Sequence, residues 1–247
     1  MAIMRPSSRP RHARLAVTSL LALATAGCPS MPMMTTAKTL GHDNGELTIA
    51  PGVFGFSLSA FQEQPASGTP PEIAGTLVLP EIALAYRHGI GERFELGATL
   101  SGLGHLALDG KIALVGNGKD ESGNEDLFTL ALDPTVGGVF VGAADIGGGY
   151  IDFGLPVLMD VAPTDWFRVT LGPRYRGTIL FVSAGDQSES ADLHYIGLGL
   201  GTEFVINETV ALQPHGTYDL LLNPAGGAGI GTSFKMLTGG LAVKLRF

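Results

Sequence analysis

The chain has 247 residues, a formal net charge of −8 and a mean hydropathy of +0.28. Its acidic balance repels phosphate backbones, which argues against a nucleic-acid partner. No apolar run approaches the roughly 18 residues that a membrane helix needs, and 36 glycines would weaken helices. An apolar chain without a helical span is typical of a closed β-barrel in a lipid bilayer.

Residues 1–27 have the pattern of a secretory signal peptide, because an arginine-rich region precedes an apolar stretch over residues 15–26. The stretch ends in ATAGC, which resembles the lipobox of bacterial lipoproteins, although Thr25 stands where that family usually has leucine. The resemblance implies cleavage before Cys28 and acylation of that residue. Cys28 is the only cysteine, so no intrachain disulfide can form. Ordinary cleavage near Ala26, leaving a free thiol, is the alternative.

Residues 28–45 are polar and small, which predicts a flexible periplasmic tether. Residues 46–247 then alternate between apolar and polar side chains, and this domain is predicted to be all-β. The predicted strands cover residues 47–61, 81–87, 93–101, 105–114, 128–136, 151–160, 167–179, 194–204, 210–220 and 241–247. We therefore expect an antiparallel transmembrane β-barrel of about ten strands, with counts from 8 to 12 left open.

Local features within these strands carry further expectations. The hairpin YRHGIGERFELG, from Tyr86 to Gly97, resembles the strand–turn–strand units of barrels in the phenol-degradation meta-pathway family of outer-membrane proteins. The glycine-rich run GLGLGT at residues 197–202 lies mid-strand without a following helix, so it favours strand curvature over phosphate binding. We expect bulges near Pro51 and at the prolines inside predicted strands: Pro80, Pro134, Pro156, Pro173 and Pro214.

Aromatic placement favours a barrel over a soluble periplasmic β-sandwich. One group flanks the turns predicted at the periplasmic end or the C-terminus: Tyr86, Phe94, Phe128, Trp166, Phe167, Phe204 and Phe247. A second group flanks the predicted outer loops: Phe140, Tyr150, Phe181, Tyr195 and Phe234. Two such girdles are expected where aromatic rings sit at the lipid headgroups, whereas a sandwich would bury its aromatic residues mid-strand.

Charged residues gather on the face that we assign to the lumen. The acids are Glu81, Glu95, Asp109, Asp133, Asp152, Asp160, Glu203 and Asp219, and the bases are Arg87, Arg93, Lys111, Arg168, Arg174, Arg176, Lys244 and Arg246. The signs balance, which predicts a salt-bridged interior. An anion path or ligand clamp along the arginines of residues 167–179 is the alternative.

The last seven residues, LAVKLRF, place Leu241, Val243, Leu245 and Phe247 on one face. This pattern resembles the closing strand of bacterial outer-membrane barrels, in which a terminal phenylalanine is recognised by the barrel-assembly machinery. The resemblance implies an outer-membrane location, with the N-terminus periplasmic and outer-membrane lipid and the assembly machinery as partners.

Little in the sequence points to catalysis. His105 lies near Ser101, and lipid-modifying barrel enzymes use histidine with serine, but no orienting acid is evident from the sequence. The other histidines have no metal-ligand spacing. We therefore expect no enzyme activity, no cofactor and no metal, and a closed or narrow barrel that passes or binds small solutes of unidentified kind. A lipid-modifying enzyme is the alternative function.

Overall fold

The computed structural model describes residues 33–57, 76–102, 104–116, 126–143, 146–184, 187–223 and 235–247. Within these ranges every regular element is a strand, and no helix is long and apolar enough to cross a membrane. The strands are β1 (Gly45–Ser57), β2 (Thr76–Gly91), β3 (Phe94–Ser101), β4 (His105–Val115), β5 (Phe128–Leu132), β6 (Thr135–Ala143), β7 (Ile146–Thr164), β8 (Phe167–Ala184), β9 (Gln187–Val205), β10 (Val210–Asn223) and β11 (Lys235–Arg246). The signal peptide and Cys28 lie outside the described residues.

The sheet closes on itself through its first and last strands. β1 pairs antiparallel with β2 on one side and with β11 on the other. In the β1–β11 seam, Glu46 lies opposite Arg246 and Phe56 opposite Met236, so the two strands pair along most of their length. Closure leaves no unpaired sheet edge, which satisfies the backbone hydrogen bonds in lipid.

β5 and β6 are two halves of one strand. Both pair with β4, and both pair with β7 on the opposite side. They are separated by Asp133 and Pro134, where the proline lacks a backbone donor for the ladder. The barrel therefore has ten strands, which confirms the predicted antiparallel β-barrel of about ten strands.

Side chains alternate between the lumen and the outer wall. In β2, Glu81 and Arg87 are buried, whereas Ile82 is 64% exposed and Leu84 is 42% exposed. Leucine, isoleucine and valine side chains cover the outer wall of the other strands in the same way. An apolar outer surface around a polar interior is the reverse of a soluble sandwich and suits a barrel surrounded by lipid.

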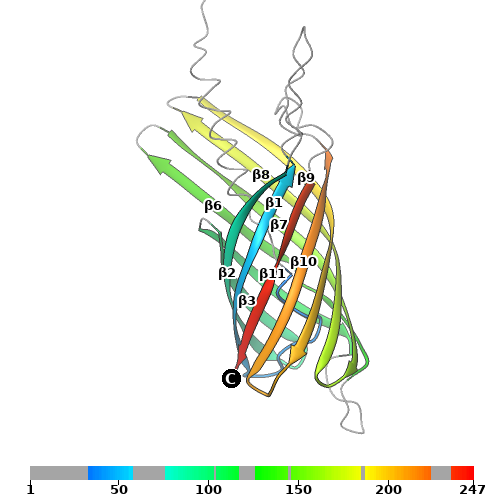
Figure 1. Cartoon of the computed structure of the whole chain (residues 1–247). Coiled ribbons are helices and arrows are strands. Elements are labelled where there is room, and N and C mark those ends of the chain that lie inside the picture. Colours follow the sequence, from blue (N-terminus) through cyan, green and yellow to red (C-terminus); the bar gives the residue numbers. More distant parts are fainter. Residues whose placement is uncertain are drawn as a thin grey trace, which may run out of the picture.

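We refer to the end of the barrel where β1 begins and β11 ends as the base, and to the opposite end as the rim (Figure 1). The turns at the base that the structure describes are short, since only Asp165 and Trp166 separate β7 from β8. At the rim, the β6–β7 and β8–β9 hairpins project beyond the other strands (Figure 1). β3 has only 8 residues, so the wall is lower where it turns into β4.

The predicted aromatic girdle at the base is present. Phe247 stacks on Tyr86 with ring centroids 6.4 Å apart. Phe167 packs against Trp166 and Phe204, at centroid distances of 5.8 and 5.3 Å. The contact between Phe247 and Tyr86 joins the two ends of the barrel sequence, and that between Phe167 and Phe204 joins β8 to β9, so the girdle also holds the base of the wall together.

The predicted girdle at the rim is only partly correct. Phe140 and Phe181 form an outward-facing pair with centroids 5.5 Å apart. Tyr150 and Tyr195, in contrast, are buried inside the barrel. The prediction is wrong for these two tyrosines because they occupy lumen positions in the alternation of β7 and β9. Phe234 lies outside the described residues.

The bulges expected at prolines are absent from the described strand pairs, apart from the interruption at Pro134. Pro51, Pro80, Pro156, Pro173 and Pro214 pair in continuous register with Ile82, Val53, Arg174, Leu198 and Leu241. Register shifts occur elsewhere, near strand ends. In a closed sheet each strand is fixed by neighbours on both sides, so the loss of one donor does not shift the register.

Candidate functional site: a charged and plugged lumen

The lumen holds almost all of the charged side chains that alternation assigns to it. The buried ones are Glu81, Arg87, Glu95, Asp109, Lys111, Asp133, Asp152, Asp160, Arg168, Arg176, Glu203, Asp219 and Lys244. Arg174 and Arg246 are half-buried and reach lumen carboxylates. Buried charges are tolerated only when they are paired or hydrogen-bonded, so the network of contacts decides what the lumen can do.

Two charges differ from the predicted set. Arg93 is exposed in the turn between β2 and β3, because β3 begins one residue later at Phe94. Glu46 is buried on β1 and pairs with Arg246 at 2.9 Å, although the predicted strand started after it. The predicted balance of signs is therefore wrong, and carboxylates outnumber cations among the lumen side chains that the structure describes.

One ion-pair cluster near the base is centred on Arg87. Its guanidinium lies 3.0 Å from Glu95, 2.8 Å from Asp109 and 3.3 Å from Asp133. Lys111 approaches Glu95 at 2.6 Å. These side chains come from β2, β3, β4 and the break between β5 and β6, so the cluster links consecutive strands on one side of the lumen.

A second cluster near the base is centred on Glu203 of β9. Its carboxylate meets Lys244 at 2.7 Å, Arg246 at 2.8 Å and Arg168 at 3.4 Å. Glu46 continues the cluster across the β1–β11 seam through Arg246. This cluster therefore links the closing strand to β1 and to β8 and β9.

Residues 33–40 lie inside the base of the barrel, between these two clusters, and we refer to them as the plug. The Lys111 ammonium donates to Thr35 Oγ1 at 3.1 Å and to the carbonyl oxygens of Thr36 and Lys38 at 2.9 and 2.8 Å. The backbone N–H groups of Lys38 and Leu40 donate to Asp160 and Glu95 at 3.1 and 3.0 Å. Charged side chains of the lumen thus provide hydrogen-bond partners for the backbone of the plug, which forms no strand.

The plug overturns the prediction of a flexible tether for its described part. Met33, Met34, Thr35, Thr36, Ala37 and Thr39 are all buried. From residue 41 the chain is hydrogen-bonded to the end of β2, next to the β2–β3 turn. The backbone N–H of Asp43 donates to the Gly89 carbonyl, and the backbone N–H of Gly89 donates to the Asn44 carbonyl. Small polar residues were interpreted as a solvated linker, but the same composition also fits a narrow, hydrogen-bonding lumen.

Glycines in the opposite wall make room for the plug. A Cβ atom at Gly172 or Gly199 would come within 2.5 Å of Met33 Sδ, and one at Gly201 would lie 3.5 Å from its terminal methyl. Gln213 completes this socket by donating to the Met33 carbonyl at 3.3 Å. The GLGLGT run, which predicted strand curvature, therefore also provides the space into which Met33 fits.

Several solved structures share the fold. The attachment invasion locus protein Ail of Yersinia pestis matches with 11% identity and a TM-score of 0.38, covering 83% of this chain and 99% of that chain. Neisserial surface protein A matches with 10% identity and a TM-score of 0.41, covering 83% and 97%. The outer membrane protease OmpT from Escherichia coli matches with 9% identity and a TM-score of 0.46, covering 86% and 99%. The strand pairings show that the chain folds as a closed antiparallel β-barrel of ten strands. At these identities the likeness concerns the fold alone, and no family model and no curated protein matches the chain.

Above the plug, toward the rim, each of the next two arginines of β8 is paired with its own carboxylate. Arg174 binds Asp219 through two hydrogen bonds, and Arg176 donates to Asp152 at 2.9 Å. Together with Arg168 they are the β8 arginines for which an anion path was the alternative prediction. Each of the three contacts a carboxylate on another strand. This arrangement matches the interior ion pairing that was weighed against an anion path.

A cavity of about 70 Å³ opens beside these pairs. Its wall includes Arg87, Asp109, Ser101, His105, Arg174 and Arg176, so charges of both signs and polar side chains line it. The space is large enough for a few water molecules or a small functional group. A solute that enters this cavity can meet charged side chains.

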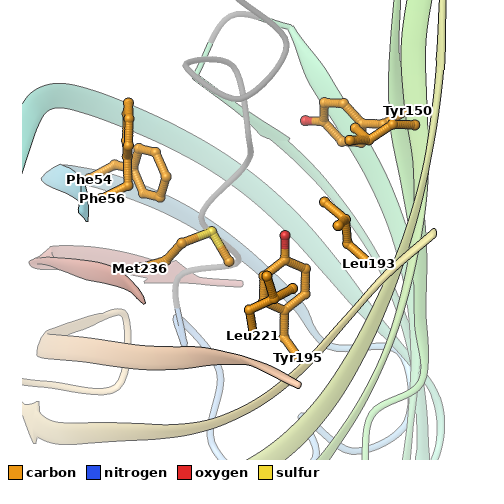
Figure 2. Packing of buried hydrophobic residues seen from close by; sticks show 8 residues of the cluster. Phe54, Phe56, Tyr150, Leu193, Tyr195, Leu221 and Met236 are labelled. Atoms are coloured by element: carbon orange, nitrogen blue, oxygen red, sulfur yellow. The ribbon is translucent and has the colours of Figure 1, made fainter. Parts of the chain in front are cut away.

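Nearer the rim, the lumen wall becomes apolar. Figure 2 shows Phe54, Phe56 and Met236 facing Tyr150 and Leu193 from opposite sides, with Tyr195 and Leu221 between them. These inward-facing residues were missed for three reasons. Tyr150 and Tyr195 were predicted as girdle positions, and Phe54 and Phe56 lay in a predicted strand whose faces were not assigned. No strand was predicted at Leu193, Leu221 and Met236. The described lumen is therefore layered, with charges and the plug at the base and an apolar wall toward the rim.

The structure also brings an acid to the Ser101–His105 pair. Ser101 Oγ lies 3.4 Å from His105 Nδ1, and the other ring nitrogen lies 3.3 Å from an oxygen of Asp152. All three side chains are buried in the lumen wall. Asp152 is on β7, separated from β4 by β5 and β6, so nothing in the spacing of the sequence indicated this contact.

Proposed function

We propose that the protein is an outer-membrane barrel closed to free diffusion by its own plug, with a solute-accessible lumen on the side of the rim. The observation that carries this proposal is the placement of residues 33–40, which are buried except for the half-buried Lys38 and Leu40 and are hydrogen-bonded to charges on several strands. A plug held in this way occupies the narrow base that a solute would have to cross.

The proposed orientation places the base in the periplasm and the rim at the cell surface. Outer-membrane barrels generally have short periplasmic turns and longer extracellular loops. The two-residue turn between β7 and β8 is at the base, and the projecting hairpins are at the rim (Figure 1). The N-terminal part of the mature chain would then enter the barrel from the periplasmic side.

The closed state can be tested by single-channel recording in planar bilayers. We expect the wild-type barrel to show no sustained conductance, and a variant lacking residues 33–40 to conduct, because the deletion removes the plug and leaves all ten strands intact. A heat-modifiability gel must show that the deletion variant is folded. Equal conductance of the two folded proteins would contradict the proposal, since the plug would then not obstruct passage.

We further propose that Cys28 is acylated. Four residues lie between Cys28 and Met33, and the five steps from one Cα atom to the next can span about 17 Å. Gly201, which faces Met33, lies four residues from the end of β9 at the base, or roughly 13 Å along the strand. An acylated N-terminus can therefore return to the base and the periplasmic leaflet. Labelled palmitate should enter the wild type and not Cys28→Ser, and equal labelling would refute acylation.

The outward face of β11 supports the proposed role of the terminal strand in assembly. Leu241, Val243, Leu245 and Phe247 all lie on the outer side, away from buried Ala242 and Lys244. The terminal Phe247 also exchanges two backbone hydrogen bonds with Gly45, at 2.8 and 3.0 Å. The strand that carries the assembly signal is thus the one that completes the barrel.

A further inference from the structure

The Ser101–His105–Asp152 group combines the three functions of a hydrolytic triad. A hydroxyl contacts one nitrogen of an imidazole ring, and a carboxylate contacts the other. Such groups are recognised by geometry and role rather than by sequence order or fold. The contacts of 3.4 Å are long for hydrogen bonds, but nucleophile–base contacts commonly tighten only when substrate binds.

The group faces free space rather than a packed core. Ser101 and His105 line the cavity of about 70 Å³, together with Arg174 and Arg176. The reacting hydroxyl therefore has room for a substrate carbonyl. Arg174 and Arg176, which are paired with Asp219 and Asp152, line the same cavity, as does Asp109. Preorganised positive charge near an attacked carbonyl is a major source of transition-state stabilisation.

The histidine also touches the apolar part of the lumen. The rings of His105 and Tyr150 stack, with centroids 5.9 Å apart and an interplanar angle of 18°. Tyr150 belongs to the apolar cluster toward the rim, with Leu193 on the same wall (Figure 2). A substrate with a carbonyl at Ser101 could place an apolar chain along these residues.

The lack of a side chain at Gly137 leaves room for the imidazole ring of His105. A Cβ atom at Gly137 of β6 would lie 2.6 Å from His105 Nε2. Gly137 pairs with Ala107 of β4, and a Cβ atom there would also lie 2.9 Å from Ala107 Cβ and from the Leu106 carbonyl oxygen, so a side chain would displace the ring and strain the β4–β6 pair. Gly137 thus acts as a positioning residue for His105.

We propose that Ser101, His105 and Asp152 hydrolyse carboxylic esters that carry an apolar acyl chain. His105 Nδ1 accepts the Ser101 proton while Oγ attacks the carbonyl carbon, and Asp152 accepts a hydrogen bond from Nε2–H and stabilises the imidazolium. The tetrahedral intermediate collapses, the bond to the alcohol oxygen breaks, and His105 returns the proton to the leaving alcohol.

Water then completes the reaction. It attacks the acyl-serine carbonyl while His105 accepts its proton, the bond to Oγ breaks, and the proton returns to Ser101. The sum is one ester and one water converted to one acid and one alcohol, with no other reactant. This activity goes beyond the proposed closed barrel and does not depend on whether the lumen conducts.

The test uses the full barrel purified in detergent, with p-nitrophenyl octanoate and acetate as substrates and a fluorophosphonate as a serine-directed label. We expect hydrolysis by the wild type, octanoate preferred over acetate, and the label mapped to Ser101 by peptide mass spectrometry. Ser101→Ala and His105→Gln should lower kcat/KM about a hundredfold or more, the usual contribution of a positioned base and nucleophile. Thr217→Ala removes another buried lumen hydroxyl, on β10, and should leave the rate unchanged.

Two positioning variants separate chemistry from folding. Asp152→Asn and Gly137→Ala should lower kcat with little change in KM, and each must still show the heat-modifiable mobility of a folded barrel. A folded wild type that hydrolyses neither ester faster than Ser101→Ala, or that is not labelled at Ser101, overturns the hydrolytic assignment. Equal rates with octanoate and acetate overturn the assignment of the apolar wall to an acyl chain.

Discussion

Replacing Lys111 with methionine should release the plug while leaving the wall of the barrel in place. Methionine keeps the length of the side chain and removes the ammonium, which donates to Thr35 and to the carbonyls of Thr36 and Lys38. Hydrogen bonds to a charged group contribute about 1.5–3 kcal/mol each. Because water can replace part of this loss, we take about 3 kcal/mol for the three together.

A loss of that size corresponds to about a hundredfold change in the opening equilibrium of the plug. Hydrogen exchange measures it directly, because the amides of Lys38 and Leu40 are protected by Asp160 and Glu95. In Lys111→Met these amides should exchange about a hundredfold faster, whereas strand amides should keep their protection. Glu95 retains Arg87 as a partner at 3.0 Å, which limits the damage to the wall.

Lys244→Met is the matched control. Lys244 is as deeply buried as Lys111, but its ion pairs are with Glu203 and Glu46 on the wall. The control should alter exchange near the β1–β11 seam and leave the amides of the plug protected. If the two variants exposed the plug equally, or if neither did, the inference that Lys111 holds the plug would be refuted.

Three further predictions concern the socket, the outer wall and the closing strand. Gly199→Ala should displace Met33, because its Cβ would lie 2.5 Å from the Met33 sulfur, and should speed exchange in the plug; Gly110→Ala, whose nearest neighbour would be 3.5 Å away, should not. Leu171→Arg places a charge on the lipid face at a cost of about 2–4 kcal/mol near the midplane, so the folded fraction on a heat-modifiability gel should fall much further than for the lumen change Arg174→Gln; the reverse order would mean that the two faces are swapped. Deleting Phe247 should lower the amount of assembled barrel, because it removes the stack on Tyr86 and the paired hydrogen bonds with Gly45. Removing residues 241–247 should abolish assembly by leaving β1 and β10 partly unpaired, and a soluble, protease-resistant product would contradict the membrane barrel.

Local patterns in the sequence were sufficient to predict the wall. The period-two alternation in a strand directly determines which side chains share a face. Residues such as Glu81 and Arg87 could therefore be assigned to the lumen, and Ile82 and Leu84 to the outer wall, before any pairing was known. The closing pattern at residues 241–247 and the lack of a helical span then favoured a barrel over other all-β folds.

Faces are less certain where the alternation is blurred or a strand boundary is displaced. Arg93 was assigned to the lumen because the strand was predicted to start one residue too early. Glu46 was missed because the strand was predicted to start too late. Tyr150 and Tyr195 were assigned to a girdle from their position near the strand ends, but the strands continue past them and their parity points inward.

The interior depended on contacts that no local pattern encodes. Met33 reaches glycines about 140 to 170 residues further along the chain, and the plug amides reach Asp160 and Glu95. Asp152 reaches His105 across the lumen wall, past β5 and β6. The sequence by itself determined the alternation, the approximate strand count and the polarity of each face, because these follow from the geometry of a single strand. Only the tertiary structure decided which lumen charges pair, that the supposed tether fills the base, and that a serine, a histidine and an aspartate meet at one cavity, because closing the sheet is what places residues from distant strands opposite one another.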